Sequence, residues 1–329
     1  MYPNFASYVL SNGGKISPIL IPNKGGGLMN PSLLVSNDRI RVILRQINYT
    51  LYHSEKKRII SPWGPLTYMH PEDDMHLRTE NWYLELNDNL EVTRYNKIDT
   101  SKFDTYEPRW EFVGLEDARL VYWNNKHYIT GVRRDTTENG QGRMELSEID
   151  INENNVTEVS RTRIEPPLDP TSYCEKNWMP VRDKPFTYVK WSNPTEVVEV
   201  NGSQSTRLCI HESIPLSRDI RGGSQILSVG DYYLGLTHEV DLFKDKHGRK
   251  DGNYWHRFMV WDKEWNIVKY SKEFTFLSGH IEFAIGMDKY KDDILITFGF
   301  QDNAAYVLRT NLKQIQSLLN DDIEITFSN

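Results

Sequence analysis

Short apolar runs separated by turn residues predict that this chain folds mainly as β-hairpins. In the clearest case, the β-forming run Leu120–Trp123 is followed by the turn Asn124-Asn125 and by a second run, His127–Val132. Two such runs joined by two Asn residues are typical of a hairpin. The segment Gly114–Arg119 leads into the first strand and carries two adjacent carboxylates. A lone pair of this kind is more often a solvated turn, but strand ends can also aim such residues at a site.

The same layout recurs along the chain. In each case a polar or glycine-containing segment precedes a strand, a turn follows, and a second strand returns. The five segments are Asn30–Ser32, Gly114–Arg119, Glu175–Asn177, Arg221–Gly223 and Gly279–Glu282. Further strand-like runs follow each hairpin, as at Trp82–Leu86 and Phe258–Trp261, so each unit holds about four strands.

Repeats of this kind predict an all-β fold, a five-bladed β-propeller of four-stranded blades. Five units in 329 residues give roughly 60 residues a unit. A large β-sandwich or two β-domains are the alternatives. We expect one domain over residues 1–329, with residues 1–28 as an N-terminal extension of a strand or two and residues 311–320 as a C-terminal helix. The run Leu312–Leu319 is the only clear helical pattern, and Asn311 is its expected cap.

Composition and charge narrow the classes of function. The net charge is −7 and no block of Lys or Arg stands out, which argues against a nucleic-acid duplex surface. Cys174 and Cys209 give neither metal-ligand spacing nor a disulfide framework. The N-terminus lacks a secretory pattern and no apolar run is long enough to span a membrane, so we expect a cytoplasmic protein. Aromatic residues make up 12% of the chain, which suits both β-structure and sugar binding.

In a propeller, the ends of the innermost hairpins meet around one central channel. The polar residues that lead into the first strands are Asn30, Glu116, Asp117, Lys176, Asn177, Arg221, His280 and Glu282. Those that close the second strands are Arg45, Arg133, Arg134, Lys190, His238, Glu239, Gln301 and Asp302. Each alone is more often a solvated strand end, but their recurrence in all units predicts a shared pocket. Carboxylates and amides suit sugar hydroxyls and the cations suit phosphate, so we expect a ligand that combines sugar and phosphate.

Motifs for other chemistries are absent from the sequence. There is no Walker loop, no Gly-x-Gly-x-x-Gly after a strand, no nucleophile-elbow serine and no His-Glu-x-x-His. His256 and His280 stand alone beside predicted strands, where structural or hydrogen-bonding roles are commoner than metal ligation. We therefore expect no metal and no cofactor.

The segment Gly114–Arg119, Gly-Leu-Glu-Asp-Ala-Arg, resembles the Gly-x-Glu-Asp-Pro-Arg signature of the glycoside-hydrolase family 130 β-mannoside phosphorylases and related β-1,2-mannosyltransferases/phosphorylases. Other segments resemble that family's pattern in the same order: Asn30–Ser32, Glu175–Asn177, Thr237–Glu239, Glu282–Gly286 and Phe298–Asp302. The chain departs from the pattern at Ala118, Trp178 and Glu239, which indicates a divergent branch. The resemblance implies a five-bladed propeller and an enzyme of carbohydrate metabolism that acts on β-mannosides.

The resemblance also implies a mechanism and its residues. One carboxylic acid protonates the leaving oxygen through a sugar hydroxyl, while phosphate attacks the anomeric carbon from the opposite face with inversion. The acid would be Asp117, and we expect Glu116 to raise the pKa of Asp117 by like-charge repulsion. The residues that would bind the sugar substrate are Arg45, Glu116, Arg119, Lys176, Asn177, Glu282 and Asp302. Those that would bind the phosphate or donor are Arg133, Arg134, Arg143 and His238.

Arg133 and Arg134 end the strand that returns from the Asp117 hairpin. Because neighbouring strand residues point to opposite faces, we expect one arginine to reach the anion and the other to be structural, paired with a carboxylate. The strand register decides which is which.

Three functions are compatible with these residues. A glycoside phosphorylase that forms or uses a sugar 1-phosphate is favoured over a hydrolase. A glycosyltransferase of the same fold would take a nucleotide-sugar donor, with the arginines on its diphosphate. A non-catalytic carbohydrate-binding propeller would not need to keep the acid. The expected partners are an oligosaccharide or sugar acceptor and a phosphate or sugar-phosphate donor, while the sugar and the oligomeric state stay open.

Overall fold

The computed structural model of the protein describes residues 4–22, 26–49, 59–60, 67–68, 74–216, 218–244, 250–319 and 325–326. Residues 1–3 and 23–25 of the expected N-terminal extension, and Asn320 of the expected helix, lie outside these ranges. Within the described ranges the chain forms 24 strands and two helices, which confirms the all-β prediction.

Most strands follow one another in antiparallel sets, each ordered largely as the chain runs. The first set is β2 (Leu28–Ser36), β3 (Arg39–Ile47), β6 (Leu77–Leu86) and β7 (Val92–Asp99). The second set is β9 (Leu115–Trp123), β10 (Lys126–Arg133), β11 (Arg143–Ile151) and β12 (Val156–Arg163). The third set is β13 (Met179–Pro180), β14 (Thr187–Ser192), β15 (Thr195–Asn201) and β16 (Gln204–Ile210).

The fourth set is β17 (Ile220–Gly222), β19 (Tyr232–Lys244), β20 (Lys250–Trp261) and β21 (Ile267–Tyr270), with β18 (Leu227–Val229) also paired to β19. The fifth set is β22 (Glu282–Tyr290), β23 (Asp293–Phe300), β24 (Ala304–Asn311) and β1 (Lys15–Pro18). Three short strands complete the described elements: β4 (Ile59–Ile60) pairs with β5 (Thr67–Tyr68), and β8 (Phe112–Val113) runs parallel to β6.

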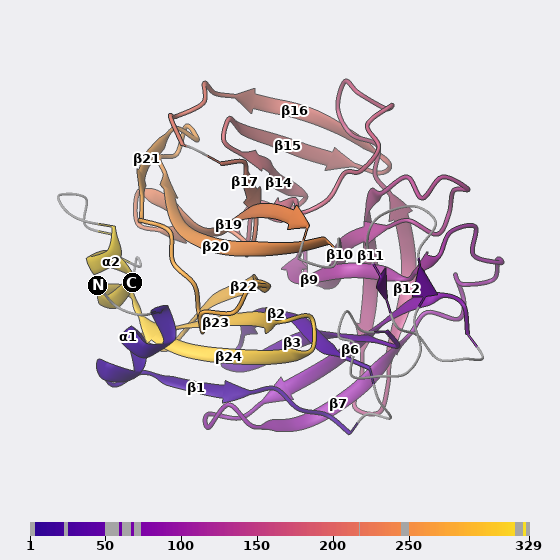
Figure 1. Ribbon diagram of the computed structural model, residues 1–329, viewed down its shortest axis with the longest axis horizontal. Coiled ribbons are helices and arrows are strands. Elements are labelled where there is room, and N and C mark those ends of the chain that lie inside the picture. Colours follow the sequence, from indigo (N-terminus) through magenta and orange to yellow (C-terminus); the bar gives the residue numbers. More distant parts are fainter. Residues whose placement is uncertain are drawn as a thin grey trace.

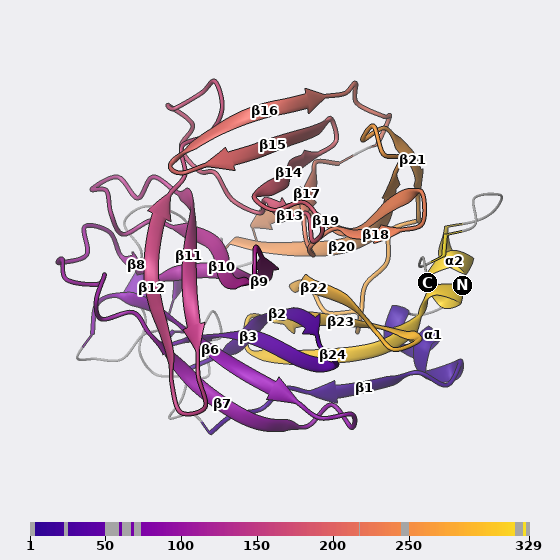
Figure 2. The ribbon, with the colours of Figure 1, turned by 180° about the vertical axis from the view of Figure 1, so that it is seen from behind.

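The sets lie side by side around a common centre (Figure 1). Strands β9 and β22 lie near the middle, whereas β7, β12, β16 and β1 lie at the periphery, and the view from behind agrees (Figure 2). The first and second sets are joined by a short parallel contact between β7 and β12. Strand β1 pairs with β24, so the start of the chain supplies the outermost strand of the last set.

Both termini carry a short helix. Helix α2 (Leu312–Leu318) begins where the sequence predicts, and Asn311 caps it by accepting the backbone N–H of Gln314. Helix α1 (Phe5–Ser11) was not predicted, because its seven residues are too few to show a helical period. Its Phe5 packs edge-on against Phe258 of β20, which anchors the segment that precedes β1. No helix in the described ranges is long and apolar enough to cross a membrane.

Buried apolar clusters fill the spaces between neighbouring sets. Trp123 of β9 packs against Tyr188 of β14, with ring centroids 5.6 Å apart. Phe258 of β20 and Phe298 of β23 belong to another such cluster. Because the apolar faces are buried between sheets, the ends of the inner hairpins are left for polar side chains.

Candidate functional site

Arg45 lies at the centre of the candidate site and links two neighbouring carboxylates. Its Nη1 donates to Asp117 Oδ1 over 2.9 Å, and its Nη2 donates to Glu116 Oε2 over 3.1 Å. The same guanidinium donates to the hydroxyls of Tyr49 and Thr79, over 3.0 and 3.1 Å. The Arg45 side chain is 5% exposed, whereas those of Glu116 and Asp117 are 18% and 14% exposed. The enclosed arginine therefore holds two carboxylates that keep a face open to a ligand.

Several polar residues of the site have left-handed backbone conformations. The angle φ is +43° at Asn30, +53° at Asp117, +63° at Asn177 and +50° at Asp302. Asn and Asp tolerate this region better than most residues with a Cβ, and such conformations gather at functional sites. The backbone thus explains why Asn and Asp occupy these positions.

A β-bulge presents the carboxylate pair. The sequence placed the pair just before a strand, but the structure has both residues inside β9. The pairing of β9 with β10 shifts between Thr130 and Val132, which sets two residues of β9, Asp117 and Ala118, opposite the single Gly131 of β10. A Cβ on Gly131 would lie 2.4 Å from the carbonyl oxygen of Glu116, so this close approach needs glycine.

Asp117 is ionised at neutral pH, contrary to the expectation of a raised pKa. Burial favours its neutral form, but Arg45 and the Asn30 amide, which donates over 2.8 Å, outweigh burial and hold the pKa of Asp117 below its usual range. The ammonium of Lys176 acts in the same direction. Because Arg45 bridges both carboxylates, it offsets the repulsion that Glu116 was expected to exert.

Asp302 differs from Asp117 in its protonation. Burial, together with the negative charges of Asp117 and Glu116, raises the pKa of Asp302 from 3.8 to about 6, although Arg45 opposes the shift. Near pH 6 one arginine therefore interacts with an ionised Asp117 and a half-protonated Asp302. Two carboxyls pushed to different protonation states are typical of acid–base sites.

His238 lies on another side of the site and is neutral. Its ring is nearly parallel to that of Tyr254, with centroids 5.9 Å apart, and it contacts Phe283 at 4.5 Å. Burial, and then nearby cationic groups that include Arg221 and Lys176, hold the pKa of His238 well below 6.5. Its Nδ1 has no hydrogen-bond partner among the described residues.

Lys176 and Arg221 bring positive charge to this side. Lys176 is exposed and influences the pKa of both Asp117 and His238, so its ammonium is within electrostatic range of both. Arg221 is partly exposed, pairs with His238 across β17 and β19, and influences the pKa of Tyr254. The site therefore has carboxylates on one side and accessible cations on the other.

Besides Nδ1 of His238, three buried polar atoms at the site lack a hydrogen-bond partner among the described residues: Oδ1 of Asn30, Oδ1 of Asn177 and Nη2 of Arg119. Arg119 is otherwise held, because its Nε donates to the Gly223 carbonyl oxygen over 2.8 Å and its Nη1 to that of Asp117 over 3.1 Å. Unpartnered buried polar atoms are rare. A polar ligand with hydroxyl groups would satisfy them.

Arg133, expected at the phosphate, is enclosed in ion pairs instead. It is 2% exposed, its Nε donates to Glu145 over 2.7 Å, and its Nη1 lies 3.5 Å from Asp135. Asp135 in turn accepts the backbone N–H of Gly114 over 3.1 Å. Arg133 therefore supports the turn that leads into Glu116 and offers a ligand no surface.

Arg134 lies on the side of the carboxylates. Burial opposes its charge, but Glu116 and the hydroxyl of Tyr173 are among the groups that raise its pKa. Its Nη2 donates to the Tyr173 hydroxyl over 2.9 Å, and its Nε donates to the Gly140 carbonyl oxygen over 3.0 Å. Strand β10 ends at Arg133, so the two arginines part where the strand ends: Arg133 is enclosed in the sheet, and Arg134 contacts Tyr173 and Gly140.

Arg143 and Glu282 were also expected to touch ligand, but both are buried and used structurally. Arg143 donates to the Glu165 carboxylate and to the carbonyl oxygens of Pro170 and Ser172, which ties it to the segment 165–176. Glu282 accepts the backbone N–H groups of three residues in the turn before β22: Phe276, Leu277 and Gly279.

Two tyrosines of the site were not predicted. Tyr49 contacts Arg45, and Tyr254 is close enough to Asp302 and Asp117 for their charges to raise its pKa, after the larger effect of burial. Tyr254 is two residues before His256, which is the same-face spacing of a strand. This two-residue spacing from a histidine is the signal in the sequence that could have indicated Tyr254 as a site residue.

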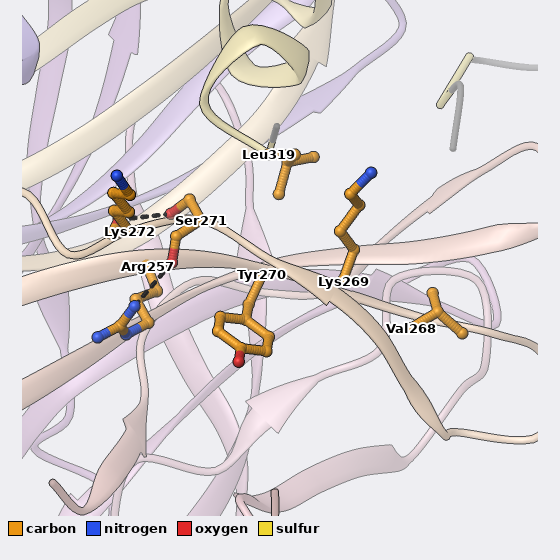
Figure 3. Close-up of a pocket in the computed structure, with 7 residues that line it drawn as sticks. All are labelled: Arg257, Val268, Lys269, Tyr270, Ser271, Lys272 and Leu319. Atoms are coloured by element: carbon orange, nitrogen blue, oxygen red, sulfur yellow. Dashed lines mark hydrogen bonds between the residues drawn. The ribbon is translucent and has the colours of Figure 1, made fainter. Parts of the chain in front are cut away.

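A pocket of about 340 Å³ lies elsewhere, beside β21 and the end of α2 (Figure 3). It is lined by Arg257, Val268 to Lys272, and Leu319. Arg257 is already paired with Glu239 and Glu273, and no carboxylate lines the pocket. Chemistry therefore favours the Arg45 centre over this pocket. In the described ranges no group of three or more His, Cys, Asp or Glu residues could hold a metal ion.

No family model matches the chain, and no curated protein matches its sequence. Solved structures match it over most of its length. The β-1,2-mannobiose phosphorylase from Listeria innocua aligns with a TM-score of 0.59 and 12% identity, over 92% of this chain and 96% of that chain. A structure from the GH130 family of mannoside phosphorylases, described with glycoside hydrolases that target β-1,2-mannosidic linkages in Candida mannan, aligns with a TM-score of 0.60 and 14% identity, over 88% and 85%. A glycosyl hydrolase from Bacteroides ovatus aligns with a TM-score of 0.58 and 13% identity, over 88% and 85%. The chain therefore has the fold of the glycoside-hydrolase family 130 proteins.

Proposed function

We propose that this protein is a carbohydrate-active enzyme that transfers a glycosyl group at a β-mannoside-like linkage with inversion, as a glycoside phosphorylase. The observation that carries the proposal is the pair of carboxylates of Glu116 and Asp117, to which Arg45 donates hydrogen bonds, in a fold that a mannoside phosphorylase shares. A carbohydrate-binding module has no need to bury a cation behind two carboxylates. The proton donor in this proposal is Asp117.

The proposed architecture is a five-bladed propeller in which each set of strands is one blade. Three observations support it: the sets are antiparallel, β1 completes the last one, and all surround a common centre (Figures 1 and 2). In a propeller, the bulged starts of β2 and β9 would lie on the same face of the ring. The contact between Asn30 of β2 and Asp117 of β9 agrees with that arrangement.

The transferred sugar is proposed to lie against Asn30, Arg45, Asp117 and Asp302. Carboxylate oxygens accept hydrogen bonds from sugar hydroxyls, and enclosed Arg45 holds the Asp117 carboxylate in position for them. The unpartnered Oδ1 of Asn30 would gain a donor from such a ligand. A ligand that satisfies several buried polar atoms at once is selected by its hydroxyl pattern, because an analogue that lacks one hydroxyl leaves an atom unpaired.

Phosphate is proposed to bind on the side of Lys176, Arg221 and His238. Lys176 and Arg221 are accessible, whereas Arg133 and Arg143 are enclosed. A neutral His238 can donate one N–H to a phosphate oxygen, and the two cations supply the charge that a dianion requires. Lys176 is in electrostatic range of both His238 and Asp117, which supports a phosphate next to the sugar.

The reaction needs one proton and one nucleophile. In phosphorolysis, Asp117, which is ionised in the free protein at neutral pH, must first take up a proton, and it then gives this proton to the leaving oxygen, directly or through a sugar hydroxyl. The bond between the anomeric carbon and that oxygen breaks, a phosphate oxygen bonds to the anomeric carbon from the opposite face, and Asp117 is left as carboxylate. In the reverse direction the carboxylate accepts the proton of the attacking hydroxyl. The lowered pKa of Asp117 suits this synthetic direction at neutral pH.

The test uses the purified full chain with β-1,2-mannobiose, with and without inorganic phosphate, and with mannose 1-phosphate plus mannose. Phosphorolysis predicts mannose 1-phosphate that forms only when phosphate is present, and its loss in Asp117→Asn. Free mannose released without phosphate would instead identify a hydrolase. Turnover with a nucleotide sugar alone, measured as nucleoside diphosphate, would identify a glycosyltransferase. Either result would overturn the proposal.

A further inference from the structure

We propose that Tyr173, held by Arg134, is the platform for the second sugar of the substrate, so that the segment 165–176 decides which acceptor the enzyme takes. The proposal rests on the proposed function, because it assumes that the Arg45 centre binds the transferred sugar. It concerns the binding position of the second sugar, beside the transferred sugar, which the proposed catalytic residues do not define.

Tyr173 lies next to the proposed site in the chain and in space. It precedes Lys176 by three residues, and Lys176 is in electrostatic range of Asp117. The Tyr173 hydroxyl accepts the Nη2–H of Arg134, and Arg134 interacts with Glu116. The pairing of β10 with β9 sets Arg133 opposite Leu115, the residue before Glu116, so Arg134 starts beside the carboxylate pair and its side chain reaches the Tyr173 hydroxyl.

The segment that carries Tyr173 is rigidly attached to the second set of strands. The Tyr173 carbonyl oxygen accepts the backbone N–H of Gly142 over 2.9 Å, and the Glu175 N–H donates to the Gly142 carbonyl oxygen over 3.0 Å. Buried Arg143 donates to the carbonyl oxygen of Ser172 over 2.8 Å. Tyr173 is thus fixed at its backbone on both sides and at its hydroxyl.

Despite these attachments, the Tyr173 side chain stays exposed. Tyr173 is 51% exposed, so its ring is not used to fill the core. The Arg134 guanidinium lies 5.4 Å from the centroid of that ring and 5.7 Å from that of Phe112. An aromatic ring that is both held in place and exposed binds the apolar face of a pyranose at little entropic cost.

The chemistry of the platform indicates a neutral hexopyranoside. The ring of Tyr173 offers an apolar surface and Arg134 offers N–H donors for hydroxyl groups. An acceptor carboxylate or phosphate would meet Glu116 as well as Arg134, so a charged acceptor gains less from this position than a neutral one.

The experiment compares the binding of β-1,2-mannobiose with that of mannose by calorimetry, in the wild-type protein and in three variants. Tyr173→Ala removes the platform, Tyr173→Phe keeps the ring, and Tyr95→Ala removes a similarly exposed tyrosine on the peripheral strand β7. For Tyr173→Ala we expect about tenfold weaker binding of the disaccharide, which corresponds to about 1.4 kcal/mol, and unchanged binding of mannose. Tyr173→Phe and Tyr95→Ala should stay within about twofold of wild type.

The other possible results separate a failure of the Tyr173 proposal from a failure of the proposed reaction. Unchanged disaccharide binding in Tyr173→Ala, or equal losses for mannose and mannobiose, would overturn the platform. If wild type binds mannobiose but forms no mannose 1-phosphate, the proposed reaction fails while the binding comparison still tests Tyr173. If wild type binds neither sugar, both proposals are wrong. A thermal melt of each variant shows whether a loss of binding comes from misfolding.

Discussion

Replacing Asp302 by Asn tests the electrostatics of the candidate site through the stability of the fold. The carboxyl of Asp302 has a pKa raised from 3.8 to about 6, first by burial and then by its acidic neighbours, although Arg45 opposes the shift. The amide has nearly the same shape but does not titrate. The variant therefore removes one pH-dependent contribution to the free energy of unfolding and leaves the packing largely intact.

The sign and size of the effect follow from linkage. Between pH 4 and pH 6 the folded state binds the Asp302 proton more tightly than the unfolded state, so the stability of the wild-type protein falls as pH rises through that window. A shift of about two pKa units, at 1.36 kcal/mol each, gives about 3 kcal/mol as an upper value. Asp302→Asn should therefore gain stability relative to wild type, by up to about 3 kcal/mol, between pH 4 and pH 7.

Urea unfolding at several pH values between 4 and 7 measures this difference. Asp99→Asn is an informative control, because hydrogen bonds from the side chain and backbone N–H of Ser101 lower the pKa of exposed Asp99. A group whose pKa is lowered by folding stabilises the folded state at pH values above its unfolded-state pKa, and this stabilisation is lost as pH falls. Relative to wild type, Asp99→Asn should therefore become less stable as pH rises, whereas Asp302→Asn should become more stable.

The reasoning on Asp302 would be refuted by a difference that does not change with pH, or by one in which the wild-type protein gains stability as pH rises. Either outcome would mean that the pKa of Asp302 in the folded protein is not raised above its usual value. The contrast with Asp117 would then disappear, and with it the distinct protonation states around Arg45.

Three further predictions concern single residues. Asp117→Asn should lower kcat by about 10²–10⁴-fold with an unchanged thermal melt, since an amide cannot deliver a proton; near-normal initial rates would place the acid elsewhere. Lys176→Ala should raise the KM for phosphate about tenfold and change the KM for the sugar little; equal changes in both would remove Lys176 from the phosphate side. Arg133→Met should destabilise the fold by about 3–5 kcal/mol in urea unfolding, because Glu145 and Asp135 lose their buried cation, and a neutral effect would contradict the structural role of Arg133.

Hairpins and helix ends were readable from the sequence because their signals are local. The run Leu120–Trp123 and the run His127–Val132 match β9 and β10, and Asn311 caps α2 as its pattern indicates. Helix α1 was not predicted because its seven residues, about two turns, are too few to show a helical period. Its stability comes from contacts such as that of Phe5 with Phe258.

The sequence also predicted which kinds of residue lie at the site, but it did not predict the role of each residue. The sequence placed Arg133, Arg134 and Arg143 together as candidates for one anion. In the structure, ion pairs with Glu145 and Asp135 enclose Arg133, and the Glu165 carboxylate and backbone carbonyls take up donors of Arg143. Which guanidinium is accessible depends on partners that are distant in the sequence.

By itself, the sequence determined an all-β chain with recurrent hairpins and with carboxylates, amides and cations at their ends. Only the tertiary structure decided that Arg45 comes from one set of strands to neutralise the carboxylates of the next, which lowers the pKa of Asp117 where repulsion from Glu116 was expected to raise it. Local patterns depend on neighbours along the chain, so they can be recognised from the sequence alone. A pKa depends on burial and on charges a few ångströms away in space, and these exist only once the sheets have come together.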